Sequence, residues 1–143
     1  SPQILIIGAT QSDVYYGFAD SKGQQKLTSL TNPQPRDFSG NPFWHPLTGK
    51  SIIADREGNI EIGDTELNNR TLLVDKSRLD GTPTHGIDWQ PIEEKVLIST
   101  FERNINISNP RSVMYVATPD GDLKKIKEVF RGTAIWLDHY HGV

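Results

Sequence analysis

Short apolar runs, each flanked by Gly, Pro, Asn or Asp, recur every 8 to 15 residues along this chain of 143 residues. Runs of this length between turn residues are typical of β-strands, and little helical periodicity lies between them. The clearest runs are 4–7, 14–18, 51–54, 71–74, 96–99 and 112–117. The pattern therefore predicts an all-β fold.

One segment departs from this pattern. Across residues 122–130, Leu123, Ile126, Val129 and Phe130 fall at helical spacing. A helical turn or two therefore stays open there as an alternative to a strand.

The chain also repeats itself. Trp44 is followed two residues later by Pro46, and Trp89 by Pro91, with 45 residues between the two tryptophans. A Lys and an aliphatic run follow each pair, and Trp136 comes 47 residues further on without a Pro. A repeat of this length, built from four strands, is typical of a propeller blade rather than a helical solenoid.

The repeat divides the chain into three units within a single domain. We place them at residues 1–40, 41–83 and 84–132, with 133–143 as a closing strand. The prediction is a partial β-propeller of about three four-stranded blades.

The motifs resemble the repeat of TolB-like β-propellers. The resemblance rests on Trp-x-Pro, the Lys-aliphatic run, and the sequence Asp55-Arg56-Glu57-Gly58-Asn59, while His45 and Gln90 stand where that family has Ser. It implies that Trp44, Trp89 and Trp136 fill the space between blades and that Asp55 and Arg56 close a turn. It also implies a periplasmic or secreted setting.

Three blades are too few for a ring, since propellers have four to eight. We expect a six-bladed ring, completed by self-association as a homo-oligomer or by a missing propeller half. Ile4 begins the second strand of the first blade, so that blade lacks a first strand. Residues 136–142 of one copy would supply this first strand to the first blade of a partner.

Composition excludes several function classes. The net charge of −3 disfavours nucleic acid as a partner, and the absence of Cys excludes disulfides, thiol nucleophiles and Cys-ligated metals. No apolar run approaches the ~18 residues of a membrane-spanning helix, so no membrane insertion is expected. Gly-x-Ser-x-Gly, Walker and Gly-x-Gly-x-x-Gly motifs are also absent, so we expect neither catalysis nor a cofactor.

We therefore predict a non-catalytic binding or scaffold module that recognises a protein or a small ligand. Ligands commonly bind at the mouth of a propeller's channel, and strand order places His85, Asp37, Asn41 and Arg103 there.

His139 and His141 are weak candidates for a metal site, because i and i+2 on a strand share one face. We expect them instead to be surface or ring-closing residues.

Two other functions stay open. TolB-like blades also form the propeller of prolyl-oligopeptidase-type hydrolases, whose catalytic domain would lie elsewhere. Carbohydrate-binding propellers also assemble from chains of few blades.

Overall fold

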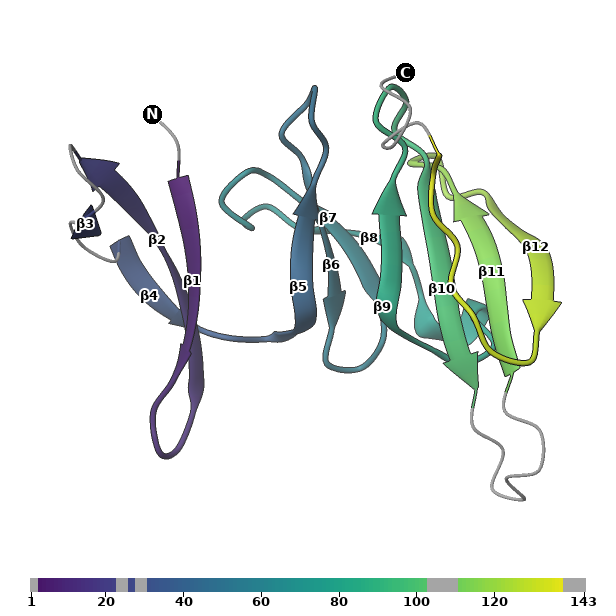
Figure 1. Ribbon diagram of the computed structural model, residues 1–143, viewed down its shortest axis with the longest axis horizontal. Coiled ribbons are helices and arrows are strands. Elements are labelled where there is room, and N and C mark those ends of the chain that lie inside the picture. The colour runs from purple at the N-terminus through teal and green to yellow at the C-terminus, as the bar shows by residue number, and fades with distance from the viewer. Residues whose placement is uncertain (1–2, 23–25, 28–30, 103–110, 138–143) are drawn as a thin grey trace. The chain divides into compact units, whose positions relative to one another are not determined.

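The computed structural model describes residues 3–22, 26–27, 31–102 and 111–137; the side chains of residues 3, 21, 22, 26, 27, 31, 32, 84 and 85 lie outside this description. The described chain is all-β, apart from one short 3-10 turn, and forms antiparallel sheets from strands that are consecutive in sequence (Figure 1). Two compact units, 1–37 and 38–143, hold these sheets.

The first unit contains one sheet. Its strands are β1 (Gln3–Ala9), β2 (Val14–Lys22), β3 (Lys26–Leu27) and β4 (Thr31–Pro35). β1 pairs with β2 along its whole length, from Gln3 opposite Asp20 to Ala9 opposite Val14. Because that edge of β2 is taken, β3 and β4 follow one another along its other edge. The sheet is therefore three strands wide, with the third strand interrupted.

The second unit contains two sheets, each four strands wide and in chain order. The second sheet has β5 (Phe38–Trp44), β6 (Ser51–Asp55), β7 (Ile60–Gly63) and β8 (Thr71–Val74). After the 3-10 turn η1 (Lys76–Arg78), the third sheet has β9 (Thr82–Trp89), β10 (Val96–Glu102), β11 (Arg111–Ala117) and β12 (Leu123–Val129).

A common hydrophobic core joins the second and third sheets. Its members come from both sheets and include Ile52, Ile60, Trp89, Ile98 and Tyr115, all less than a tenth exposed. Burying apolar area of this kind is the main force that holds two sheets face to face. Each of these two sheets therefore depends on the other for its stability.

The predicted helical alternative at residues 122–130 is wrong, because residues 123–129 form β12. Met114 pairs with Lys127 and Tyr115 with Lys125, so Ile126 is an extra residue between them. Such a bulge breaks the alternation of a strand. It places the apolar residues at spacings that imitate a helix.

The predicted boundaries of the repeat units lie close to the first residues of the second and third sheets. β5 begins at Phe38 and β9 at Thr82, a few residues before the boundaries placed at 41 and 84. Of the predicted closing strand 133–143, residues 133–137 run without ladder pairing and 138–143 lie outside the described residues.

Candidate functional site

The residues predicted to line a channel mouth are only partly described. Asn41 is exposed on β5, where the pairing with β6 shifts between Ser39 and Phe43. Asp37 is exposed and ends the first unit, whereas Asn41 belongs to the second. The side chain of His85 and all of Arg103 lie outside the described residues. The grouping of these four residues therefore stays a prediction.

The tryptophans of the repeat make corresponding contacts. Trp89 Nε1 donates to the carbonyl oxygen of Phe43, the residue before Trp44, at 3.3 Å. Trp136 Nε1 donates to the carbonyl oxygen of Asp88, the residue before Trp89, at 3.2 Å. Each indole thus reaches back to the same point of the preceding repeat.

Trp44 makes a different contact. Its Nε1 donates to the carbonyl oxygen of Thr65, within its own sheet's turns, at 2.9 Å. Trp44 is half-buried, whereas Trp89 is only 2% exposed. The equivalence therefore holds for the second and third tryptophans.

The residue after each of the first two tryptophans caps a turn. His45 Nδ1 accepts from the backbone N–H groups of Leu47 and Thr48, at 3.2 and 3.3 Å. Gln90 Oε1 accepts in the same way from Ile92, at 2.6 Å, and from Glu93. Both side chains are buried, so they satisfy N–H groups that would otherwise lose hydrogen bonds to water.

The two capped turns present apolar side chains to solvent. Leu47 is 72% exposed and Ile92, its counterpart 45 residues later, is 53% exposed. A salt bridge of 2.8 Å between Lys50 and Glu94 links the turns. This end of the second unit therefore carries two exposed aliphatic side chains, one on each turn, and a salt bridge between the turns.

An acidic side chain closes the hairpin between β6 and β7. Asp55 Oδ1 accepts from the N–H groups of Glu57 and Asn59, and Asn59 Nδ2 donates to Asp55 Oδ2. Burial by itself raises the pKa of the Asp55 carboxyl, but these hydrogen bonds together lower that pKa below its usual value. Gly58 has a φ of 100°, which glycine adopts without strain. Arg56 is exposed.

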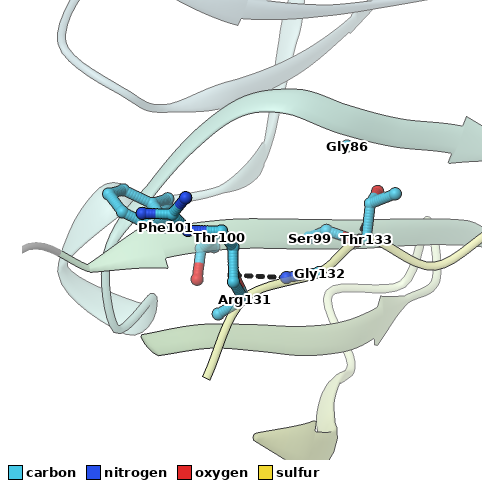
Figure 2. Close-up of a pocket in the computed structure, with 8 residues that line it drawn as sticks. Gly86, Ser99, Thr100, Phe101, Arg131, Gly132 and Thr133 are labelled. Carbon is cyan, nitrogen blue, oxygen red and sulfur yellow. Dashed lines mark hydrogen bonds between the residues drawn. The ribbon is translucent and has the colours of Figure 1, made fainter. Parts of the chain in front are cut away.

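A pocket of about 360 Å³ lies on one face of the third sheet, under the segment that follows β12. Gly86, Ser99 and Ser112 lie on that face, which we call the Ser99 face, and Figure 2 shows Arg131, Gly132 and Thr133 on the covering segment. The Ser99 face is opposite the core face, because side chains alternate along a strand.

Hydroxyl groups hold the covering segment on the Ser99 face. Ser99 Oγ accepts from the Ala134 N–H at 3.0 Å, and Ser112 Oγ accepts from the Gly132 N–H at 3.2 Å. Trp136 N donates to Asp88 Oδ2 at 3.0 Å. Side chains of the sheet, rather than a backbone ladder, therefore position residues 132–136.

Apolar residues around this segment remain exposed. Ile126 and Phe130 at the end of β12 are 53% and 62% exposed, and Ile135 and Leu137 on the segment itself are 52% and 63% exposed. Large apolar side chains left this exposed are candidates for burial by another element.

A cluster of five charged side chains lies on the third sheet, where β10 ends and β11 begins, next to β12. Lys125 Nζ contacts Asp80 Oδ2 at 2.8 Å and Glu128 Oε1 at 3.2 Å. Arg111 contacts the same Glu128 at 3.0 Å and also pairs with Glu102. The acidic and basic groups largely neutralise one another, so the arrangement serves to bind these strands together.

The same contacts explain the shifted pKa values in the cluster. The hydrogen bond from Lys125 lowers the pKa of the Asp80 carboxyl. The hydrogen bond to Glu102 raises the pKa of the Arg111 guanidinium. Burial raises the pKa of the Tyr115 phenol, whose oxygen accepts from the Asp80 N–H at 2.8 Å. Sequence reasoning missed this cluster, because only the strand register brings Glu102, Arg111 and Lys125 together.

The metal hypothesis for His139 and His141 falls on residues outside the description. Among the residues that are described, no group of three or more His, Asp or Glu side chains is placed to hold a metal ion. Nor is any helix in the described part of the chain long and apolar enough to cross a membrane.

Comparison with known proteins adds no assignment. No family model, curated protein or solved structure matches this chain.

Proposed function

We propose that this chain is a non-catalytic binding or scaffold module of the TolB-like propeller type. The observation that carries the proposal is the repeated indole contact, Trp89 to Phe43 and Trp136 to Asp88. A contact that recurs from one four-stranded unit to the next is what stacked propeller blades require. The setting that goes with this family type is periplasmic or secreted.

The exposed apolar groups next to the Ser99 face support a further part of the proposal. Ile126, Phe130, Ile135 and Leu137 are each more than half exposed. A neighbouring blade would bury them, and we propose that it comes from a second copy of the chain or from another propeller half. The working form of the module is then a closed ring.

Ligand recognition is proposed at the end of the ring where the first strand of each blade begins. Asp37, Asn41, His85 and Arg103 fall at or near that end in the strand order. Asn41 lies within β5 and His85 within β9, so the sheets would hold these two candidates in place.

Selection of a displayed random peptide library against the purified chain tests the recognition. We expect selected peptides to lose at least tenfold in affinity for Asn41→Ala and His85→Ala. Lys127→Ala, an exposed change on β12, is the matched control and should leave the affinity unchanged.

Two results contradict the proposal. One is peptide binding that is indifferent to the mouth variants. The other is turnover of fluorogenic proline-containing peptides by the chain itself, which a non-catalytic module does not show. Binding of oligosaccharides in preference to peptides would instead identify the ligand as carbohydrate.

A further inference from the structure

β1 is an apolar strand with one open edge. Its sequence, Gln-Ile-Leu-Ile-Ile-Gly-Ala, contains no charge and no Pro, and it pairs regularly with β2 without a bulge. No described strand pairs with its other edge, and Ile4 is 39% exposed. Proteins normally protect such edges with charges, Pro or bulges, because an unprotected apolar edge accepts another strand.

Strand register identifies which position is open. Ala19, Gly63 and Ala117 occupy the same place in their repeats, each directly before Asp20, Asp64 or Thr118. In the ladder they pair with Ile4, Ser51 and Val96, respectively. β1 is therefore the counterpart of β6 and β10, the second strands of the other two sheets.

In those two sheets the other edge of the second strand is filled. Ser51 pairs with Trp44 on β5, and Val96 pairs with Trp89 on β9. The open edge of β1 is thus the place of a first strand, and a tryptophan belongs opposite Ile4.

Residues 134–137 lie after the third sheet and pair with no described strand. Trp136 reaches back to Asp88 as Trp89 reaches back to Phe43, so the segment lies where the next unit would begin. Its contacts with the third sheet run through Ser99 Oγ and Asp88 Oδ2. This leaves its backbone without a described ladder partner.

Building on the proposed function, we propose that residues 134–137 of one copy add to the open edge of β1 in a second copy. The repeat fixes an antiparallel register, with Trp136 opposite Ile4, Ile135 opposite Leu5, and Ala134 opposite Ile6. Backbone hydrogen bonds supply the affinity of such strand addition, and alternate side chains supply its specificity.

A second copy is the occupant that the strand count favours. Within the described residues, each copy has one open first-strand position on β1 and one segment, 134–137, without a ladder partner, so two copies can satisfy each other. Rings of this type need at least four sheets, so the three described sheets are too few to close a ring by themselves. Two copies supply six sheets, and the addition also covers Ile135 and Leu137.

The mass of the purified chain is the first test. Size-exclusion chromatography with light scattering should give about 32 kDa, twice the 16.0 kDa of one chain. Larger head-to-tail assemblies also support the pairing, because a head-to-tail contact that does not close forms a filament. A stable 16 kDa species at 100 µM overturns it.

Cysteine cross-linking tests the register, and the natural chain has no Cys to interfere. Leu5→Cys and Ile135→Cys are made in separate chains, mixed and oxidised, and we expect a disulfide-linked pair. Ile6→Cys mixed with Ile135→Cys is the matched control, because Leu5 and Ile6 point to opposite faces of the strand. Equal linking in both mixtures overturns the register.

Different results would contradict the strand pairing between copies and the proposed peptide recognition. A double variant, Leu5→Cys with Ile135→Cys, that cross-links only within one chain would overturn pairing between copies. Peptide recognition at the mouth would survive that result. Loss of peptide recognition with the cross-link intact would instead overturn the proposed function alone. Circular dichroism of each variant shows that it has folded.

Discussion

The side chain of His45 joins its own turn to the next one, through a contact of 3.1 Å between its Nε2 and the carbonyl oxygen of Glu93, 48 residues later. Because Nδ1 accepts from Leu47 and Thr48, the ring proton lies on Nε2 and is donated to Glu93. The ring also meets Trp89 edge-on, with centroids 5.2 Å apart. One buried imidazole therefore caps the first turn and ties it to the second.

Replacing His45 separates the capping role from the bulk of the ring. His45→Gln should stay within about 1 kcal/mol of the natural chain, because Gln90 caps the equivalent turn with its amide. His45→Ala should cost about 2–3 kcal/mol, since buried N–H groups lose their acceptor. Urea denaturation of the two variants measures the difference, and equal losses would contradict the capping role.

Gly86 is required where β9 crosses the Ser99 face. A Cβ there would lie 2.4 Å from Ser99 Cβ, and crowding of this kind typically costs about 1–3 kcal/mol. We expect Gly86→Ala to lower the midpoint of thermal unfolding by several degrees. Gly8→Ala is the control, because nothing lies within 4 Å of a Cβ at that position. An unchanged midpoint for Gly86→Ala would show that the strands separate easily.

The two equivalent indole contacts should differ in strength. Trp89→Phe removes a donor that is nearly fully buried and should cost about 2 kcal/mol or more, because it also leaves a gap in the core. Trp136→Phe should cost less, since Trp136 is only half-buried. Its main effect should be faster hydrogen exchange at the Ala134 amide, measured by NMR. Unchanged exchange would mean that Trp136 does not hold the segment.

The charged cluster predicts a pH dependence. The pKa of Asp80 is lower in the folded chain than in the unfolded chain, so Asp80 stabilises the fold above its unfolded pKa of about 3.9. That contribution is lost as the pH falls through the folded pKa. Asp80→Asn should therefore be less stable than the natural chain at pH 6, and the gap should narrow below pH 4. Urea titrations at both pH values measure the difference in unfolding free energy between Asp80→Asn and the natural chain. A difference that does not change with pH would contradict a lowered pKa of Asp80 in the folded chain.

Most of the strands could be predicted from the sequence. The runs 51–54, 71–74, 96–99 and 112–117 all lie in strands, and the all-β prediction is confirmed. Each is a short apolar run between turn residues, which is a local signal. β12 was obscured by its bulge at Ile126, since a bulge depends on the neighbouring strand rather than on local sequence.

The sites were harder to predict. The Ser99 face and the charged cluster depend on ladder register across strands, and register is a property of pairs of strands. The predicted mouth residues Asp37, Asn41, His85 and Arg103 were grouped from strand order alone. Strand order gives the end of the sheet at which a residue lies, but not the side chains that it meets.

Each sheet is made of strands that follow one another directly in the chain. No described strand pairs with a distant segment of its own chain, so the backbone ladder of each sheet can begin to form as soon as the ribosome releases its strands. The first unit can therefore fold cotranslationally before the third sheet exists. In a chain built this way, a whole unit of about 45 residues can be duplicated or removed at a turn without rethreading the others.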